Sequence, residues 1–444
     1  MLALALTAPS ACVTIGLSPS HASEVLPLAT AAPQTPLAKA TAALDSLWST
    51  YWDEHSSYLL REAPAGDNDG DADTPLLSFW NYQEATHAMA IGASLDYKTY
   101  GPKLKAMIAG QAAMNSERQP GTGTGPGPAG TDGWNRPYFD DMNWAELALL
   151  SAHDSAATAG DKDVAEALLI GATNTSVRNI FGGTVAPKRP FPQTISSAWD
   201  TTDCGGGVYW DRRKTQKATA SNAGVALTCA LFANALNATG SVDPEANWRA
   251  EMAFEYTKFG TMIYTFWNRT MTDAVTGQVT DHYVLNGAGA CDKSSDTESF
   301  TYNEGLMLGA ATALGFEADA ARFASRLITV HVKPSTPGGP PVLSDGCETS
   351  CTGFDCPSFK GVAVRELARW LKSPLATKQP ALKASVTKVL ADSAAAVWEN
   401  ARSDGHTGPV FSATWARSTA PACKYEAAAH TSAVFALLTQ VDTI

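Results

Sequence analysis

The chain has 444 residues, of which 45% are hydrophobic and 17% are charged, so it is long enough and apolar enough to bury at least one large core. Its acidic residues outnumber the basic ones, which gives a formal net charge of −12 at pH 7 and a sequence pI of about 5.1. This charge argues against nucleic acid and anionic membranes as partners, whereas a neutral polymer such as a polysaccharide would not be repelled.

The first 22 residues are predicted to be a signal peptide. Residues 2–17 are mostly apolar and uncharged, and Ser20-His21-Ala22 resembles a small-x-small cleavage site, although the usual basic residues at the start are missing. A Pro- and Ala-rich leader follows over residues 23–36, and we expect one folded domain over residues 37–444. No other stretch is apolar over the ~20 residues of a membrane span, and the C-terminal residues lack the hydrophobic tail of a glycolipid anchor signal. We therefore expect a secreted, extracellular protein without a membrane anchor.

The eight cysteines fit an oxidising compartment. Cys12 would leave with the signal peptide. For Cys347, Cys351 and Cys356 we favour disulfides over zinc, because their spacings match no standard ligand pair and no histidine lies near. Cys229 lies in an apolar helical run and is predicted to be an unpaired, buried thiol. Weak further support for secretion comes from three N-x-S/T sequons, at Asn174, Asn237 and Asn268.

Apolar residues at helical spacing predict about twelve helices along the chain. These fall near residues 37–54, 80–97, 101–115, 143–159, 161–181, 218–239, 244–267, 302–314, 316–332, 358–372, 380–402 and 424–439. They come in pairs about 30–40 residues apart, as in helical repeats, and β-branched alternation is scarce. No residue signature repeats from pair to pair, which favours a closed ring of helices over an open array.

Three segments between the predicted helices have distinctive compositions. The acidic loop at residues 66–74 suggests calcium, but it lacks glycine at the sixth place and has Ser78 where the bidentate Glu belongs, so we favour a solvated turn. The Gly- and Pro-rich loop at 119–133 has no Lys after its glycines and no strand before them, which argues against a phosphate site and favours a flexible approach to a cleft. The long irregular segment at 182–217 is expected to line a site.

Two adjacent carboxylates, Asp140 and Asp141, are flanked by aromatic residues and followed by a helical apolar pattern. Adjacent acids repel, so in a sheltered site their pKa values split, and one can keep its proton while the other stays ionised. A glycosidase needs this division, and aromatic side chains can lie flat against sugar rings. The alternative is that one of the pair only caps a helix that begins near Asn143, and this stretch alone does not separate the two explanations.

Other catalytic arrangements find no support in the sequence. There is no G-x-S-x-G elbow and no H-E-x-x-H motif, and the eight histidines are scattered. Several aromatic residues stand beside loops or helix starts, where each taken alone is more often a core residue than a ligand-binding one. They are Trp80, Trp134, Tyr138, Trp144, Trp199, Tyr209, Trp210 and Tyr302. Gly205-Gly206-Gly207 is either a turn or a place where the backbone approaches a ligand closely.

Five segments, in order along the chain, resemble motifs of glycoside hydrolase family 76 and of its fungal cell-wall members. They are Asp140-Asp141 with Asn143-Trp144, Cys204-Gly205-Gly206-Gly207-Val208-Tyr209-Trp210, Ala220-Ser221-Asn222, Thr301-Tyr302-Asn303-Glu304-Gly305, and Cys347-Glu348 with Phe359-Lys360-Gly361 and Arg365. The resemblance covers roughly residues 40–440. Two departures concern sugar binding: Asn143-Trp144-Ala145 stands where many members carry two aromatics, and Lys217-Ala218 stands where many carry Lys-Asn.

The resemblance implies an all-α fold, the (α/α)6 barrel, in agreement with the helix count, and it implies a retaining reaction without a cofactor or a metal. By the family pattern, Asp140 matches the nucleophile and Asp141 the general acid/base. Aromatic faces would support the sugars, and Asn222 and Asn303 would bind hydroxyl groups. The full set of predicted substrate-binding residues is Trp80, Asn81, Tyr138, Asn143, Trp144, Asp203, Gly205, Gly206, Trp210, Asn222, Tyr302 and Asn303.

The activity implied by the resemblance is that of a monomeric, secreted endo-α-1,6-mannanase acting on α-1,6-mannan or manno-oligosaccharides. One alternative is a transglycosidase that passes the sugar to another sugar, as in fungal relatives thought to attach glycolipid-anchored mannoproteins to the cell wall. Another is a mannan-binding barrel without catalysis. The missing anchor tail favours the hydrolase over the transglycosidase, and the intact aspartate pair argues against the binding protein.

Overall fold

The computed structural model describes residues 35–62, 76–113, 138–179, 199–238, 246–286, 289–294, 299–349, 355–405, 407–417 and 426–441. The chain divides into a short unit, Met1–Pro33, and a large compact unit, Gln34–Ile444, and all described residues belong to the second. The signal peptide, the acidic loop at 66–74, the Gly/Pro loop at 119–133, Trp134 and Cys351 lie outside the described residues, and the expectations about them stay predictions.

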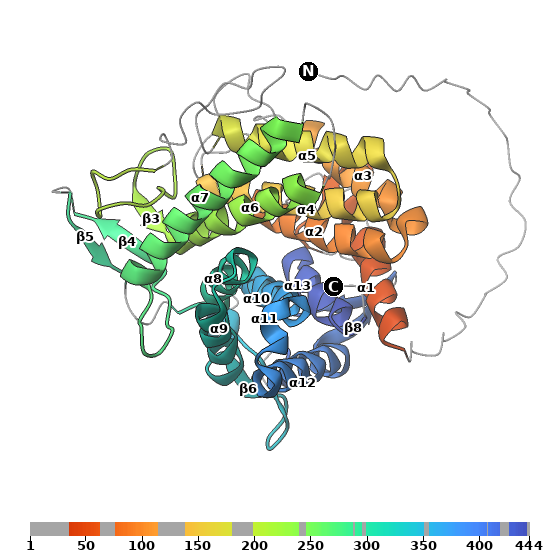
Figure 1. The fold of residues 1–444 in the computed structure, drawn as a ribbon. Coiled ribbons are helices and arrows are strands. Elements are labelled where there is room, and N and C mark those ends of the chain that lie inside the picture. Colours follow the sequence, from red (N-terminus) through yellow and green to blue (C-terminus); the bar gives the residue numbers. More distant parts are fainter. Residues whose placement is uncertain are drawn as a thin grey trace, which may run out of the picture. The chain divides into compact units, whose positions relative to one another are not determined.

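The described residues are mainly helical (Figure 1). The α-helices are α1 (Pro36–Tyr51), α2 (Phe79–Leu95), α3 (Tyr97–Ala113), α4 (Phe139–Thr158), α5 (Lys162–Asn179), α6 (Thr219–Ala238), α7 (Ala246–Met271), α8 (Thr301–Leu314), α9 (Glu317–Thr329), α10 (Cys356–Lys372), α11 (Pro374–Thr377), α12 (Pro380–Ala396) and α13 (Ala427–Leu438). A 3-10 turn, η2 (Gly346–Thr349), precedes α10, and a π-helical turn, η3 (Val397–Ala401), extends α12. All twelve predicted helices are present, and their ends lie within about one turn of those predicted when η3 is counted with α12.

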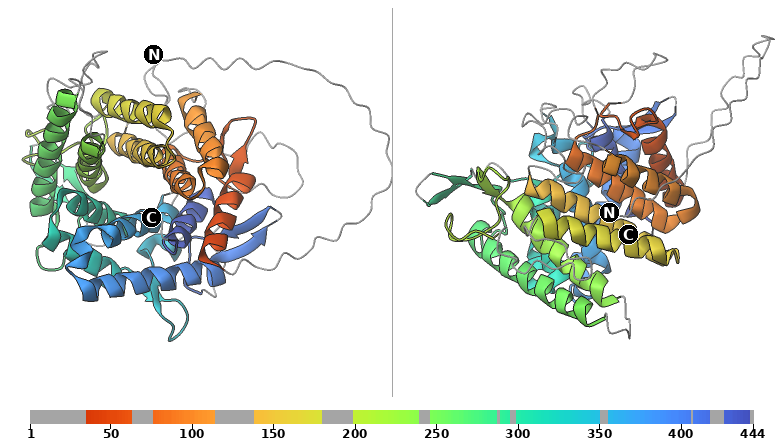
Figure 2. Two further views of the ribbon diagram at one scale, coloured as in Figure 1. Left: turned by 45° about the vertical axis from the view of Figure 1, so that its right-hand side comes forward. Right: turned by 90° about the horizontal axis from the view of Figure 1, so that it is seen from above.

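The helices form two concentric rings (Figures 1 and 2). The inner ring runs α2, α4, α6, α8, α10 and α13, each packed on the next, and α13 closes the ring against α2. Outside it, α3, α5, α7 and α9 pack on α2, α4, α6 and α8, while α12 packs on α9, α10 and α13, and α1 packs on α13. This closed alternation of outer and inner helices confirms the predicted (α/α)6 barrel.

Helix α6 shows how the sequence produces the inner ring. Contrary to the expectation from the sequence, it is long and apolar enough to cross a membrane by length and composition, yet most of its residues are buried inside the barrel. A helix that is apolar on every face must be buried on every face, and α6 is buried by packing against α4, α7 and α8. Outer helices need only one apolar stripe, and α9 accordingly buries Phe323 and Leu327, while its charged residues Glu317, Asp319 and Arg322 are half-buried.

The strands of the described chain are short and antiparallel, and they belong to the loops that join the helices. They are β1 (Trp52–Asp53) with β2 (Tyr58–Leu59), β3 (Gln216–Ala218) with β4 (His282–Leu285) and β5 (Cys291–Lys293), β6 (Val332–Pro334) with β7 (Pro341–Leu343), and β8 (Arg402–Gly405) with β9 (Gly408–Phe411). Strand β3 runs directly into α6, so the three-stranded sheet lies at the N-terminal end of an inner helix.

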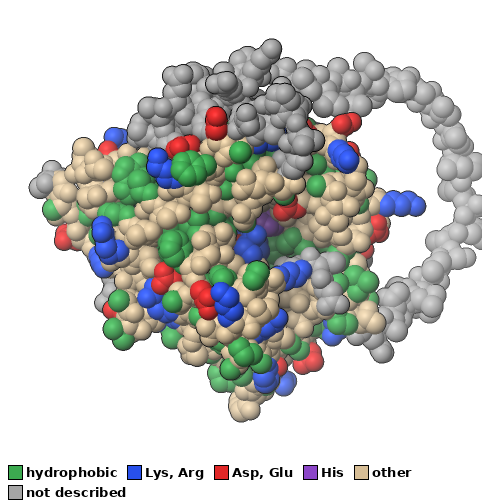
Figure 3. Space-filling view, viewed as in Figure 1, with side chains coloured by type: hydrophobic (Ala, Val, Ile, Leu, Met, Phe, Trp, Pro, Cys, Tyr) green, Lys and Arg blue, Asp and Glu red, His purple; other side chains and the backbone are tan. Residues whose placement is uncertain are grey.

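A network of charged side chains lies inside the barrel. Arg365 Nη1 contacts Glu84 Oε2 at 2.6 Å, Arg365 Nε contacts Glu366 Oε1 at 2.7 Å, and all three side chains are almost fully buried. Arg369 Nε adds a contact of 2.8 Å to Glu366 Oε2, so two acids face two bases. Figure 3 shows basic, acidic and histidine side chains meeting in a hollow near the middle of one face. Burial, reinforced by Arg365, holds the pKa of His87 well below its usual value, so His87 is neutral.

Candidate active site

The aspartate pair lies in the first turn of α4, an inner helix. That helix begins at Phe139, about one turn earlier than predicted, and Tyr138 is its N-cap with extended backbone and no side-chain capping bond. The explanation that Asp140 or Asp141 caps a helix starting near Asn143 is therefore wrong. Both carboxylates instead lie where the positive end of the helix dipole favours negative charge.

The start of α4 is fixed by a distant part of the chain, the loop that precedes β3. The Phe139 N–H donates to Trp210 O at 2.7 Å, and Tyr138 forms a β-bridge with Asp211. The Tyr138 and Trp210 rings lie with centroids 4.4 Å apart, and both side chains are half-buried. Two predicted sugar-binding aromatics therefore stand together beside Asp140.

The pair is sheltered enough for its two carboxyl groups to titrate together. Burial, and then the neighbouring Asp141 carboxylate, raise the pKa of Asp140 well above its usual value, although a hydrogen bond from the Trp210 side chain acts in the opposite direction. Asp140 Oδ1 is buried and has no hydrogen-bond partner in the described part of the chain. The pair therefore holds one proton into a higher pH range than two separate aspartates would, and that proton belongs to the pair.

A second aromatic group gathers at the N-terminal ends of α2, α8 and α10. Phe359 is its centre, with ring centroids 4.4 Å from Tyr302, 5.2 Å from Phe300 and 6.2 Å from Trp80. All four side chains are half-buried, so parts of their faces remain available. Trp80 and Tyr302 were predicted at the site. Phe300 and Phe359 were not, although Phe359 belongs to one of the family-like segments.

Two further carboxylates lie near these aromatics, and the sequence did not single them out. Trp80 Nε1 donates to Asp355 Oδ1 at 2.6 Å, and burial raises the pKa of Asp355 although this bond opposes the rise. Asp355 is nonetheless an exposed residue. The pKa of Tyr302 is raised well above its usual value, first by burial, then by Asp281, and further by Asp140 and Asp355. Tyr302 therefore contacts Asp281 directly, and the charges of Asp140 and Asp355 also act on it.

Asp281 has a different environment from Asp355. Its Oδ1 accepts the Tyr302 hydroxyl at 2.5 Å and Asn303 Nδ2 at 2.9 Å, and its Oδ2 lies 2.9 Å from His282 Nδ1. Burial alone would raise its pKa, but the hydrogen bonds from His282, Tyr302 and Asn303 outweigh burial and lower the pKa. Asp281 is therefore an ionised carboxylate next to two predicted site residues. No local motif marks it, because two of its three partners, Tyr302 and Asn303, lie on α8.

Several predicted sugar-binding residues turn out to be buried in the framework of the site. Asn222 is fully buried, and its Nδ2 donates to Val208 O at 2.9 Å and Ala218 O at 2.8 Å, so both amide hydrogens serve the backbone. Asn222 supports the loop before β3, in place of the hydroxyl contact predicted for it. Trp144 is 3% exposed and lies behind Trp80, with ring centroids 5.6 Å apart, so it offers no open face.

The other two buried asparagines join elements at the same rim. Asn81 Nδ2 donates to Ser78 Oγ at 2.7 Å, and its Oδ1 accepts from Ser358 at the start of α10. Asn143 Nδ2 donates to Ser221 O at 3.3 Å and so links α4 to α6. Both were predicted to bind substrate, and both instead hold the inner helices in register around the aspartate pair.

The glycine run favours the first of its two predicted roles, a turn. Gly205, Gly206 and Gly207 all have positive φ angles, of 71°, 152° and 102°. A Cβ on Gly206 would lie 2.7 Å from Trp199 and 3.0 Å from Phe266, so packing also requires glycine there. Asp203, another predicted site residue, accepts the Tyr209 hydroxyl at 2.5 Å within the same loop.

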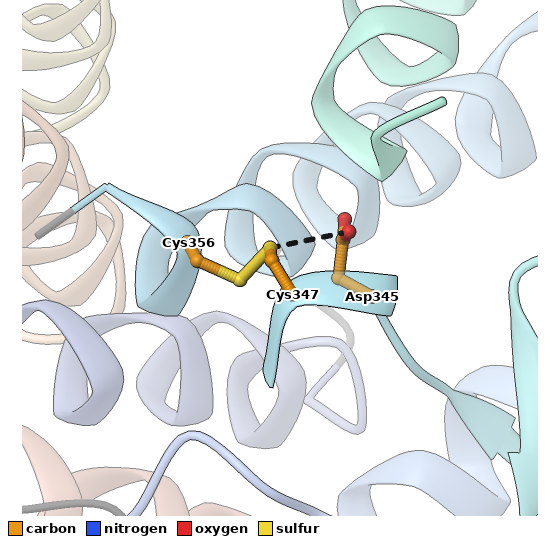
Figure 4. A group of neighbouring side chains, drawn as sticks. All are labelled: Asp345, Cys347 and Cys356. Carbon is orange, nitrogen blue, oxygen red and sulfur yellow. Dashed lines mark hydrogen bonds between the residues drawn. A yellow bond between two sulfur atoms is a disulfide. The ribbon is translucent and has the colours of Figure 1, made fainter. Parts of the chain in front are cut away.

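The cysteines confirm the preference for disulfides over zinc. Asp345, Cys347 and Cys356 lie close enough to hold an ion, but Cys347 and Cys356 form a disulfide, which leaves no thiolate to bind a metal (Figure 4). A second disulfide joins Cys204 to Cys291 and ties the loop before β3 to β5. Cys229 is buried and unpaired, as predicted.

Known proteins resemble this chain in both sequence and fold. The sequence model described as Glycosyl hydrolase family 76 matches residues 189–442. The α-1,6-mannanase GH76A of Salegentibacter sp. is 18% identical, with a TM-score of 0.63 over 91% of this chain and 98% of that one. An inactive variant of that enzyme, with two adjacent aspartates replaced by asparagine, was solved with α-1,6-mannotriose and is 17% identical, with the same TM-score and coverage. A family 76 mannosidase from Bacteroides thetaiotaomicron is 15% identical, with a TM-score of 0.62 over 92% of this chain and 98% of that one. No curated protein matches the chain.

Proposed function

Because the chain belongs to glycosyl hydrolase family 76, we propose that it is a retaining endo-α-1,6-mannanase acting on α-1,6-mannan or manno-oligosaccharides. The observation that carries the proposal is the adjacent pair Asp140 and Asp141 at the start of an inner helix, where burial and the Asp141 carboxylate raise the pKa of Asp140. In support, the similar Salegentibacter enzyme is described as an α-1,6-mannanase, and its variant lacking two adjacent aspartates as inactive.

In the first step, Asp140 attacks the anomeric carbon and forms a mannosyl-enzyme bond, while Asp141 gives its proton to the departing O6. The shared proton must therefore reside on Asp141 when substrate is bound. The Trp210 hydrogen bond favours the ionised form of Asp140 and so favours this arrangement. In the second step Asp141 takes a proton from water while the water oxygen bonds to the anomeric carbon and displaces Asp140. Asp140 is then again a carboxylate and Asp141 again an acid.

The surrounding residues suit a mannose chain. The half-buried rings of Trp80, Tyr138, Trp210 and Tyr302 offer apolar faces for the C–H sides of sugars. Asp281 is an ionised acceptor for sugar hydroxyl groups, and it is positioned by the fully buried Asn303, whose Nδ2 donates to its Oδ1 at 2.9 Å. Secretion fits the two disulfides, which persist in oxidising compartments.

A sugar acceptor in place of water would make the protein a transglycosidase. The observation that favours this second function is the segment before and within α10, which resembles that of the fungal cell-wall members. There the Cys347–Cys356 disulfide and a 2.7 Å contact between Lys360 Nζ and Glu348 Oε1 fix the chain near Asp355. The two functions differ only in what attacks the mannosyl-enzyme intermediate.

The test is incubation with linear α-1,6-mannan, with the products followed by chromatography over time. We expect short manno-oligosaccharides from the start. Products longer than the donor that appear only with an added acceptor would favour the transglycosidase. No product under either condition would contradict both activities.

Substitution of each aspartate assigns the two roles. Asp140→Asn should abolish turnover because the nucleophile is lost, and Asp141→Asn should lower it by about 100- to 10,000-fold because only the acid/base is lost. Asp154→Asn is the matched control, since that carboxylate is on the same helix but exposed, and it should leave activity unchanged. Full activity in the Asp140→Asn variant would refute the assignment.

A further inference from the structure

Lys217 is a fully buried lysine at the centre of the loop that precedes β3. Its Nζ donates to three backbone carbonyl groups, those of Asp203 at 2.6 Å, Asp200 at 2.9 Å and Gly206 at 2.9 Å. A buried ammonium is normally paired closely with a carboxylate. Here the nearest carboxylate oxygen, Asp200 Oδ1, is 3.6 Å away, and the ring of Tyr209 covers the ammonium at 4.7 Å. The three ammonium hydrogens are therefore donated to backbone carbonyl groups of the loop.

The loop around this ammonium has a backbone that does not form by itself. Four consecutive residues from Cys204 to Gly207 have positive φ angles, and for Cys204, at 57°, this conformation is unfavourable. The turn brings three carbonyl dipoles to one point, where they would repel one another without a cation. The Lys217 ammonium supplies that cation, and the loop is therefore folded around it.

The loop in turn reaches the aspartate pair through Trp210. Val208 is held by the Asn222 amide, and the Trp210 N–H donates to Gln216 O at 2.8 Å on β3. From there the Trp210 carbonyl accepts the Phe139 N–H at 2.7 Å, one residue before Asp140, and the Trp210 ring centroid lies 4.4 Å from that of Tyr138. The Trp210 side chain also lowers the pKa of Asp140. A continuous set of contacts thus runs from the Lys217 ammonium to the proposed nucleophile.

We propose that Lys217 is a positioning residue for the reaction, whose ammonium holds residues 200–210 in the conformation that keeps Trp210 against the start of α4, beside Asp140. This inference rests on the proposed function for its kinetic consequence, but its structural part can be tested without substrate. A lysine that only stabilises the fold would lower resistance to unfolding and leave the ionisation of the pair unchanged. A positioning lysine changes that ionisation, since the Trp210 bond favours ionised Asp140.

The substitution that tests this is Lys217→Met, which keeps the length of the side chain and removes its charge. We expect kcat/KM on α-1,6-mannan to fall by about 100-fold, the loss typical of a misplaced catalytic group. The acid limb of the pH profile should move to higher pH, because Asp140 without the Trp210 bond ionises at higher pH. Amide hydrogen exchange should speed up in residues 200–210 and stay slow in α4 and α6.

Lys214→Met is the matched control. Lys214 contacts the same Tyr209 ring at 5.0 Å and lies 3.8 Å from Asp200 Oδ2, yet its side chain is 62% exposed and binds none of the three carbonyls. The Lys214→Met variant should have the same activity, the same pH profile and the same amide hydrogen exchange as the parent. Parental hydrogen exchange in the Lys217→Met loop, or a fall in activity without a shift of the acid limb, would overturn the proposal.

Trp210→Phe tests the last link if Lys217→Met does not fold. It keeps an aromatic ring but removes the indole N–H together with the five-membered ring that carries it. The acid limb should therefore move as in Lys217→Met, while residues 200–210 keep slow exchange. An unmoved acid limb would overturn the proposal. If the parental chain does not cleave mannan, the proposed function fails, and a difference titration of tryptophan fluorescence between parent and Trp210→Phe still decides whether Trp210 senses the pair.

Discussion

Two segments at the rim of the barrel are built from the same parts and differ in how they balance a buried charge. One is the loop before β3, residues 200–217, which contains Cys204 of one disulfide. The other is the α10 segment, residues 345–349 and 355–360, which contains both cysteines of the second disulfide. Each segment encloses a fully buried lysine. Lys217 is surrounded by backbone carbonyls. Lys360 contacts Glu348 Oε1 at 2.7 Å, donates to Ala413 O at 2.5 Å and lies 4.1 Å from the centre of the Trp415 ring.

This difference separates stability from catalysis. The Lys360–Glu348 ion pair joins η2 to α10 inside the protein, and its loss leaves a charge in a place that water does not reach. The carbonyls around Lys217 belong to one loop, which can open toward solvent and hydrate them without disturbing the inner ring. We therefore expect changes in the α10 segment to act on unfolding of the barrel, and changes in the loop before β3 to act mainly on the aspartate pair.

The largest expected effect on stability comes from the disulfides. For them, the loop before β3 should contribute more to the free energy of unfolding than the α10 segment does. Cys204 and Cys291 are 87 residues apart in the sequence, whereas Cys347 and Cys356 are 9 apart. In the chain-entropy account, loss of the first lowers the free energy of unfolding by about 5 kcal/mol and loss of the second by about 3 kcal/mol. Urea unfolding of Cys204→Ser/Cys291→Ser and of Cys347→Ser/Cys356→Ser measures both, and an equal or opposite order would contradict this account.

The next effect in size is expected from Lys360→Met, which takes the ammonium away from buried Glu348. Breaking a buried ion pair on one side costs about 3–5 kcal/mol of unfolding free energy. Adding Glu348→Gln to this variant should recover part of the loss, because the uncompensated charge is then gone. Lys333→Met, an exposed neighbour, should change stability by no more than about 0.5 kcal/mol in the same urea titration. A Lys360→Met variant as stable as Lys333→Met would show that the pair is not desolvated in solution.

The rim also shows where reasoning from the sequence succeeds and where it stops. Helix positions follow from apolar spacing within a single segment, so the paired helices, and with them the barrel, were predictable. The start of α4 was not, because a β-bridge from Tyr138 to Asp211 and a backbone bond from Phe139 to Trp210 set it from far along the chain. The aspartate pair was found by its type and neighbours, but its place in the first turn depends on these distant contacts.

Side-chain direction was the least predictable property of the site. Asn222 was expected to face the sugar and instead binds Val208, because nothing in the local pattern tells that a loop returns to that point. Asp281 and Asp355 were missed for the same reason, since their partners Tyr302 and Trp80 lie on other helices. Residue types that suit a sugar site also suit the framework that supports it, and only the three-dimensional arrangement separates the two.

The smallest expected effect is on the free energy of unfolding at low pH and comes from Asp200 in the loop before β3. Burial would raise the pKa of Asp200, but hydrogen bonds from Thr202 and Asp203 and the Lys217 ammonium lower it to about 2. Its unfolded value is about 3.9, so the folded state is favoured above pH ~4, and this contribution is lost as pH falls from ~4 toward 2. Because Asp200 is partly hydrated, we expect the contribution to be about 1 kcal/mol.

Asp200→Asn removes this charge and keeps a hydrogen-bond acceptor in its place. The parent should therefore exceed the variant in unfolding free energy by about 1 kcal/mol at pH 5, and the difference should vanish near pH 2, as measured by urea unfolding across that range. The pH dependence identifies the cause, because a lost hydrogen bond alone would lower stability equally at both ends. A difference that persists at pH 2 would mean that Asp200 acts through its geometry, and the Lys217 ammonium would then be held by the carbonyl groups alone.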